Sequence, residues 1–306
     1  MAARRGARRA STGAATGVAL ALGLAMLPAT PAAGQDAPVV GPERGSLVIV
    51  GGALRDPEIV QAFIERAGGP DAAIVVIPTA GGGDDSDYGA ECSCLNQLRA
   101  NGARNLTVLH SYDPEVADTE AFVAPLEQAT GVWFPGGRQW RLADAYLGTR
   151  TERALRAVLD RGGVIGGTSA GASIQGSYLA RGDTRSNTVM MGDHEVGFGY
   201  LRETAIDQHL LARNRQFDLL EVIEVHPELL GIGIDEDTAV LVDGDRMEVM
   251  GGGYVAVYDA GARLPGGGPY YLLRDGDTFD LSTRTPARGG RPFLDLVRID
   301  PTSGGD

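Results

Sequence analysis

A serine flanked by glycines, in the pattern G-x-S-x-G, is the feature of this sequence that points most directly to catalysis. The pattern covers residues 167–171 and has Ser169 at its centre. The preceding residues, 162–166, form a short apolar run typical of a buried strand, and residues 170–179 can form a helix. A serine at such a sharp strand-to-helix turn exposes its hydroxyl above the sheet. The next N–H, that of Ala170, lies at a helix N-terminus, where developing negative charge is stabilised. The structural alternative is a Gly-rich turn whose serine caps the helix.

A nucleophilic serine needs a base within hydrogen-bond reach and an acid that orients this base. The chain has four histidines, and each could instead be a hydrogen-bonded structural or surface residue. His209 is favoured because it ends a predicted strand, and His194, in a polar stretch, is its main rival. His226 precedes a proline near a helix end, and His110 ends another strand.

Short apolar strands alternate with helices in the first half of the chain. The expected strands cover residues 46–50, 73–77, 106–109, 132–134 and 162–166. One expected helix begins at residue 57, a second ends at residue 100, and two more cover residues 119–128 and 151–160. This alternation predicts an α/β fold with a parallel sheet covered on both faces. Ligand sites in such folds lie at the carboxyl ends of the strands. Residues 51–52, 79–80, 136–137 and 169 all fall at such ends.

After about residue 228 the pattern changes to short strands, over residues 231–234, 239–242, 247–250 and 255–258. We expect them to form an antiparallel extension of the same sheet, since Asp243-Gly244 is a hairpin turn signal. The expected organisation is a lead-in at residues 35–45, one domain at residues 46–284 and a tail at residues 285–306.

The first 34 residues have the features of a secretory signal peptide. Four arginines among residues 4–9 precede an apolar run at residues 14–27, and residues 32–34 are a suitable cleavage site. Removal of residues 1–34 changes the net charge from −13 to −17, because it takes away four arginines and no acid. So acidic a protein is not expected to bind nucleic acid. The sequence predicts a secreted or periplasmic protein without stable membrane association after signal removal. A retained N-terminal anchor is the alternative.

The two cysteines are Cys92 and Cys94. With one residue between them, a disulfide is not expected, because it would close a very small ring. A zinc site is not expected either, because no other soft ligand is near in the sequence. We expect two reduced, partly buried thiols.

Four segments together carry a resemblance to a known family. They are G-G-R-Q at residues 136–139, G-G-T-S-A-G-A at 166–172, I-D-Q-H-L at 206–210 and G-I-D-E-D-T-A at 233–239. Their order and spacing resemble those of cyanophycinases and the other S51 serine peptidases, which include aspartyl dipeptidase. The resemblance covers residues 47–258. It implies a flavodoxin-like, class I glutamine-amidotransferase-like α/β sandwich with a mostly parallel central sheet.

The resemblance also implies roles for individual residues. Ser169 would be the nucleophile and His209 the general base, with the oxyanion hole formed by the N–H of Ala170 and one from the turn at Gly137. Five residues match positions that line the substrate pocket: Gln139, Asp207, Gln208, Arg213 and Arg215. Cyanophycinases cleave a poly-aspartate backbone that carries amide-linked arginines, and release β-aspartyl-arginine dipeptides. The implied reaction needs no metal and no cofactor, and a homodimer is possible by analogy.

The chain departs from the family pattern in three places. The orienting acid is expected near residues 185–187, where the chain has Arg-Ser-Asn. We expect Asp183 to replace it because it is nearest, and Asn187, Asp193 and Glu195 are the alternatives. The other two departures are Arg138, where the family usually has an acid, and Asp218, where a further arginine is expected.

Two other functions are compatible with parts of the sequence. An α/β-hydrolase esterase also uses G-x-S-x-G with a histidine downstream. The short interval from Ser169 to His209 and the lack of an HGGG-like loop disfavour it. A binding protein on the same scaffold, with the catalytic acid lost, is the non-enzyme alternative.

Overall fold

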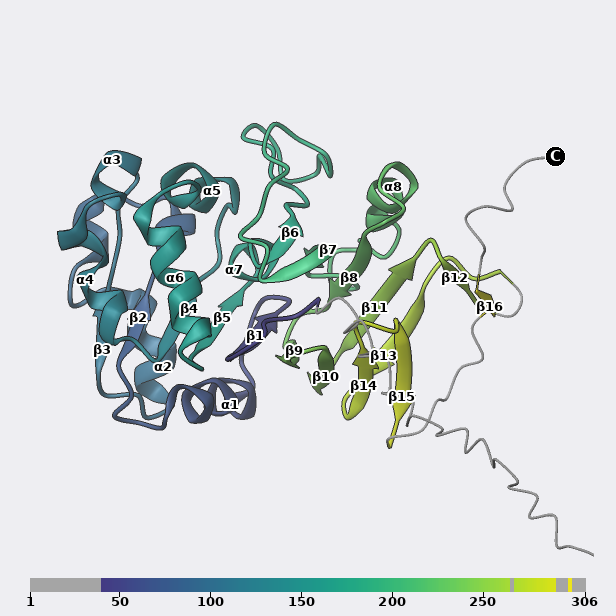
Figure 1. Cartoon of the computed structure of the whole chain (residues 1–306), viewed down its shortest axis with the longest axis horizontal. Coiled ribbons are helices and arrows are strands. Elements are labelled where there is room, and N and C mark those ends of the chain that lie inside the picture. Colours follow the sequence, from purple (N-terminus) through teal and green to yellow (C-terminus); the bar gives the residue numbers. More distant parts are fainter. Residues whose placement is uncertain (1–39, 265–266, 290–296, 299–306) are drawn as a thin grey trace, which may run out of the picture. The chain divides into compact units, whose positions relative to one another are not determined.

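Two large sheets that share one hydrophobic core form the centre of the fold (Figure 1). The computed structural model describes residues 40–264, 267–289 and 297–298. The predicted signal peptide at residues 1–34 lies outside this part of the chain. No helix within the described ranges has the length and apolar character needed to span a bilayer.

The larger sheet has nine strands in the order β15-β14-β10-β9-β1-β5-β4-β2-β3. Its parallel half consists of β1 (Ser46–Val50), β5 (Val164–Thr168), β4 (Gly131–Phe134), β2 (Ile74–Val76) and β3 (Leu106–Val108). Its antiparallel half consists of β9 (Thr238–Asp243), β10 (Arg246–Gly251), β14 (Asp277–Asp280) and β15 (Thr285–Arg288). The predicted α/β class, with a mostly parallel centre and antiparallel C-terminal strands, is thus confirmed. Because β15 pairs with β14, the sheet continues past residue 284, into the stretch expected to be a tail.

The smaller sheet has five strands in the order β13-β11-β8-β7-β6. They are β13 (Tyr271–Arg274), β11 (Tyr254–Asp259), β8 (Leu230–Ile234), β7 (Leu201–Gln208) and β6 (Gly176–Tyr178). A short pair, β12 (Ala262–Arg263) and β16 (Val297–Arg298), forms a third sheet. Contrary to the expectation from the sequence, the C-terminal strands therefore do not all extend the larger sheet. Instead β8 and β11 belong to the smaller sheet, whose Ile232 and Val257 share a core with Val240 and Val249 of the larger one.

Helices cover both faces of the parallel strands, as the βαβ pattern predicts. One face packs against α1 (Pro57–Ala67) and α2 (Asn96–Ala100), and the other against α4 (Glu120–Gln128), α5 (Trp140–Tyr146) and α6 (Arg150–Asp160). The remaining α-helices are α3 (Pro114–Ala117), α7 (Ala170–Ser173) and α8 (Asp218–Val225). Helix α1 begins as the sequence predicts, with Asp56 accepting from the N–H of Glu58 and proline in the first turn.

Backbone carbonyls of residues 50–52, at the end of β1 and directly after it, accept hydrogen bonds from three distant segments and bring these together. The carbonyl of Val50 accepts from the N–H of Ser169, and that of Gly51 accepts from the N–H of His209, at 3.0 and 2.9 Å. The carbonyl of Gly52 accepts from the N–H of Asp237, also at 2.9 Å. The end of β1 therefore aligns the segments that follow β5, β7 and β8.

Candidate active site

Ser169 occupies a strained turn between β5 and α7. Its backbone has φ 57° and ψ −111°, a conformation that residues other than glycine rarely adopt. The flanking glycines are needed because the backbone is crowded: a Cβ on Gly167 would lie 2.4 Å from the carbonyl oxygen of Gly171. A Cβ on Gly171 would lie 2.1 Å from the carbonyl oxygen of Phe134. The G-x-S-x-G pattern is therefore a packing requirement of this turn, and it leaves the hydroxyl of Ser169 directed at the end of β7.

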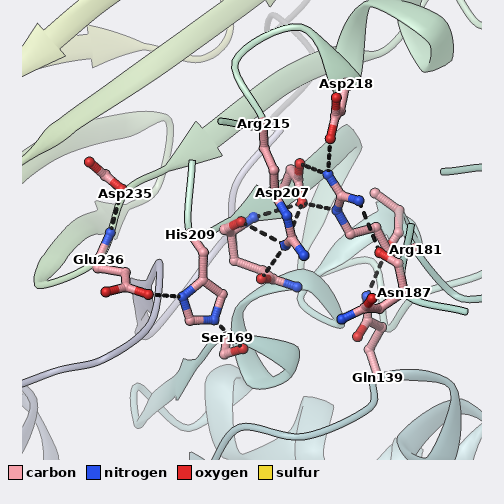
Figure 2. A network of polar contacts seen from close by, with 12 residues as sticks. Gln139, Ser169, Arg181, Asn187, Asp207, His209, Arg215, Asp218, Asp235 and Glu236 are labelled. Atoms are coloured by element: carbon pink, nitrogen blue, oxygen red, sulfur yellow. Dashed lines mark hydrogen bonds and ion pairs between the residues drawn. The ribbon is translucent and has the colours of Figure 1, made fainter. Parts of the chain in front are cut away.

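His209 follows β7 and meets Ser169 there (Figure 2). The distance from Ser169 Oγ to His209 Nε2 is 2.9 Å. His209 is 5% exposed and has φ 55°, so a tight turn directs its ring back over the end of the sheet. The sequence prediction that pairs Ser169 with His209 agrees with this geometry.

The acid that contacts His209 is Glu236, which sequence reasoning did not select. Its Oε1 lies 2.6 Å from His209 Nδ1, on the opposite side of the ring from Ser169 (Figure 2). Glu236 sits in the turn after β8, and its own N–H donates to the carboxylate of Asp235. The same Asp235 oxygen accepts the N–H groups of Leu211 and Ala212, which ties the β8 turn to the segment after His209. The signal for Glu236 was present in the D-E-D sequence at residues 235–237.

Asp183 does not have the expected role as partner of His209. Its Oδ1 accepts the N–H groups of Arg185 and Ser186, at 2.9 and 2.8 Å. Asp183 is 1% exposed and closes a local turn, so nearness in the sequence did not bring it to the histidine.

The other acids and amides considered for this role also have different contacts. Asp193 bonds Thr184 and His194, Glu195 accepts from the hydroxyl of Tyr178, and the carbonyl of Asn187 accepts from Arg181.

The remaining histidines lie in other environments. His194 is held between Asp144, at 2.7 Å, and Asp193, at 3.0 Å. His110 contacts Thr79 and Asp85 through its two ring nitrogens. His226 lies 3.5 Å from Glu228. None of these contacts involves Ser169, so among the four histidines His209 alone has the position of a base.

The electrostatic surroundings keep His209 neutral near pH 7. Burial lowers the pKa of the imidazole below its ordinary value of 6.5, and the charges of Arg213 and Arg215 lower it further. The hydrogen bond and the negative charge of Glu236 act in the opposite direction but do not cancel these effects. A neutral imidazole with Nε2 facing a serine hydroxyl can accept a proton from it.

Backbone N–H groups are available beside the serine. The N–H of Ala170 is the first of helix α7 and therefore has no carbonyl partner within the helix. The turn at residues 136–137 packs against Ser169 from the end of β4: a Cβ on Gly136 would lie 3.3 Å from Ser169 Cβ. Gly137, with φ 145°, continues this turn. Ala170 thus follows the serine directly, and the turn at residues 136–137 packs against the serine through Gly136.

Three of the five predicted substrate-binding residues, Gln208, Arg213 and Arg215, lie beside His209, whereas Gln139 and Asp207 have buried partners within the chain. Gln139 is buried and donates to the carbonyl of Ala180 at 2.8 Å. Arg215 donates to the side chain and the carbonyl of Gln208. Arg213 is exposed and close enough to His209 for its charge to lower the pKa of the ring.

Asp207 is fully buried and forms an ion pair within the chain. Its two carboxylate oxygens accept from Arg181, at 2.7 and 2.9 Å. We therefore correct the expectation that Asp207 contacts a substrate: its oxygens already have a guanidinium partner.

The two remaining departures from the family pattern have structural explanations in this chain. Arg138 donates to the carbonyl oxygen of Asp183 and so ties the turn after β4 to the segment that follows β6. Asp218, where a further arginine was expected, accepts from Arg181 at 2.5 Å. The guanidinium beside Asp207 is therefore supplied by residue 181.

Cys92 and Cys94 form a disulfide, contrary to the expectation of two thiols. The 3-10 turn η3 (Ser93–Leu95) brings their Cα atoms to 5.1 Å, a separation that a disulfide can bridge. No group of three or more His, Cys, Asp or Glu side chains with the arrangement of metal ligands occurs in the described part of the chain.

Comparison with known proteins identifies the family. Residues 47–250 match the profile of peptidase family S51. The chain is 32% identical over 267 residues to the cyanophycinase of Geminocystis herdmanii, which covers 80% of this chain and 97% of that protein. It is also 32% identical over 261 residues to the cyanophycinase of Synechococcus elongatus, covering 78% and 80% of the two chains.

A crystal structure of a peptidase from an acI-B1 actinobacterium shows the same fold, with a TM-score of 0.61 at 23% identity over 78% of this chain and 98% of that one. The family match is incompatible with the α/β-hydrolase alternative. The binding-protein alternative rested on the loss of an acid beside the histidine, and the contact of Glu236 with His209 removes this reason for it. This chain belongs to peptidase family S51 and is a serine-type hydrolase similar to the cyanophycinases.

Proposed function

We propose that Ser169, His209 and Glu236 form the catalytic triad of this peptidase. His209 Nε2 takes the proton from Ser169 Oγ as this oxygen attacks the scissile carbonyl. Glu236 accepts the Nδ1–H bond, which selects the tautomer with a free Nε2 and stabilises the imidazolium that forms. The imidazolium then protonates the leaving amine, and a water activated by the same ring hydrolyses the acyl-enzyme.

The oxyanion that forms in each tetrahedral intermediate is stabilised by the backbone N–H groups of Ala170 and Gly137. Ala170 follows the serine at the N-terminus of α7, and Gly137 belongs to the turn whose Gly136 packs against Ser169. The loss of one such donor in other serine hydrolases costs about 10²-fold to 10³-fold in rate.

The substrate we propose is a β-aspartyl peptide, with cyanophycin the leading candidate. Two observations support this: the relatives at 32% identity are cyanophycinases, and two arginines border His209. Arg213 and Arg215 can bind the free carboxylate of an aspartyl residue whose other carboxyl group is in the scissile bond. Gln208 and Gln139 add amide groups that can orient the peptide.

Incubation with cyanophycin and with β-aspartyl dipeptides tests this proposal. The expected product is soluble β-aspartyl-arginine, released by the unaltered protein and not by Ser169→Ala. Labelling of Ser169 by a fluorophosphonate without any release of dipeptide would keep the triad and reject the substrate.

We also propose that residues 1–34 direct export and are removed. The positive, apolar and small-residue regions in that order support this proposal. N-terminal sequencing of the protein from the medium or periplasm of an expressing bacterium should begin at Gln35. A protein that stays in the cytoplasm with residue 1 intact would contradict it.

A further inference from the structure

Asp207 is a buried carboxylate that two arginines approach from different segments. It is fully buried, and its Oδ1 also accepts the N–H of Gln208, the residue before His209. Arg181 binds both of its oxygens, whereas Arg215 Nη1 stays 3.9 Å from Oδ1 (Figure 2). The carboxylate therefore has one arginine as a hydrogen-bonding partner and a second within easy reach.

Arg181 is almost fully enclosed by its partners. The residue is 2% exposed, and its Nη2 contacts Asp218 in addition to Asp207, while Nη1 donates to the carbonyl of Asn187. Burial alone would lower the pKa of this guanidinium, but the hydrogen bonds and charges of Asp207 and Asp218 raise it. Arg181 is thus a permanent positive charge that the mechanism does not use.

Arg215 makes different contacts although the same carboxylate is close. Its Nη1 donates to the carbonyl and to Oε1 of Gln208, at 3.0 and 2.9 Å. Burial and the positive charge of Arg181 both disfavour its charged form, as the lowered pKa of Arg215 indicates. Arg181 thus saturates Asp207 and repels Arg215, and both effects keep Arg215 on Gln208.

We infer that Arg181 is a positioning residue. By pairing with Asp207, it keeps Arg215 on Gln208, the position from which Arg215 would bind the substrate carboxylate. This inference rests on the proposed function, in which Arg215 binds that carboxylate. The physical reason is charge balance. The charges of Arg181 and Arg215 balance those of two carboxylates, Asp207 and Asp218. Without Arg181, the cation nearest to the buried carboxylate of Asp207 in this group would be Arg215, at 3.9 Å. Because an unpaired buried charge is costly, Arg215 would move onto Asp207.

The test compares substrate binding with the reactivity of the serine in Arg181→Met, which keeps the length of the side chain and removes its charge. We expect KM for a β-aspartyl peptide to rise about tenfold to a hundredfold, the usual effect of losing a charged hydrogen bond. The rate of Ser169 labelling by a small uncharged fluorophosphonate should stay within about threefold, because the contacts of His209 with Gly51 and Glu236 do not involve Arg181. Arg156→Met is the matched control, since it removes an arginine that packs on Tyr200 and donates to Phe198, away from this network.

A merely structural role would lower labelling and peptide hydrolysis together, and that result would overturn the inference. So would an unchanged KM in a folded Arg181→Met protein. The exchange variant Arg181→Glu with Asp218→Arg keeps the net charge of the group and puts the guanidinium on the other partner. It should reverse most of the increase in KM that Arg181→Glu alone causes.

A crystal structure of Arg181→Met provides a measurement that needs no substrate. We expect the guanidinium of Arg215 to contact Asp207 there, and its persistence on Gln208 would contradict the inference. If the unaltered protein does not cleave β-aspartyl peptides, the proposed substrate fails, whereas this structural outcome still decides the role of Arg181.

Discussion

The imidazole of His209 occupies the space that a side chain on Gly52 would take. A Cβ on Gly52 would lie 2.2 Å from Cε1 of the ring, and Gly52 has φ 132°. The neighbouring carbonyl of Gly51 holds the backbone N–H of His209. The Gly-Gly pair after β1 therefore both anchors the histidine and makes room for it.

Replacement of Gly52 by alanine should consequently displace the ring of His209. We expect kcat/KM to fall by at least about 10²-fold, because a displacement of about 1 Å in a catalytic group has an effect of that size. Gly69→Ala is the control: Gly69 also has a positive φ, of 94°, but a Cβ there would meet no atom within 4 Å. It should lose about 1 to 2 kcal/mol of stability and keep its activity. Equal activities of the two folded variants would contradict the role given to Gly52.

Ser169→Ala should abolish peptide hydrolysis and fluorophosphonate labelling. Removal of a serine nucleophile costs about 10⁶-fold in kcat in a triad hydrolase. Ser173→Ala is the matched control, because Ser173 is a buried serine of the same helix α7 and contacts neither His209 nor Glu236 in the described structure. Mass spectrometry of the labelled protein should locate the adduct on residue 169, and an adduct on any other serine would refute the assignment.

Glu236→Gln should reduce kcat by about 10⁴-fold, the effect of replacing a triad carboxylate by its amide. The amide leaves the geometry similar but no longer stabilises the imidazolium. Asp183→Asn should keep kcat within about threefold, since its carboxylate serves a local turn remote from the histidine. Measured side by side, the two variants separate the acid found in the structure from the one expected from the sequence. The opposite order of activities would favour Asp183.

The pH dependence of Ser169 labelling should follow the protonation of His209. The pKa of the imidazole is lowered from its ordinary value, mainly by burial, so the rate should fall with decreasing pH as the ring becomes protonated, and this fall should lie at lower pH than for an ordinary histidine. In Arg213→Gln a positive charge that disfavours the imidazolium is removed, so the pKa rises and the fall in rate begins at higher pH. Arg153→Gln, on helix α6, should leave the profile unchanged. A downward shift in Arg213→Gln would contradict the electrostatic argument.

The sequence was most informative where the structure depends on neighbouring residues. The strand-to-helix turn at Ser169 needs glycines two residues on either side, and this requirement is visible as a five-residue pattern. The start of helix α1 at Asp56 and the alternation of strands and helices are local in the same sense. The pairing of His209 with Ser169 was predicted because both segments end predicted strands and resemble those of one family.

The carboxylate that contacts His209 could not be predicted in this way. Nearness in the sequence favoured Asp183, but the carboxylate that meets the imidazole follows β8, in the smaller sheet. Strand order within two sheets decides which strand ends lie together, and alternation of strands and helices does not specify that order. The same holds for Asp207, expected to contact substrate, because its partner Arg181 comes from a segment 26 residues earlier.

The sequence by itself thus determined the fold class, the family and the turn that holds Ser169, because these depend on local patterns and on motifs that keep their order along the chain. The tertiary structure alone decided which carboxylate contacts His209 and which arginine pairs with Asp207. The reason is that a buried charge takes the partner that the packing of the sheets brings within hydrogen-bond distance, and that partner can lie anywhere in the sequence.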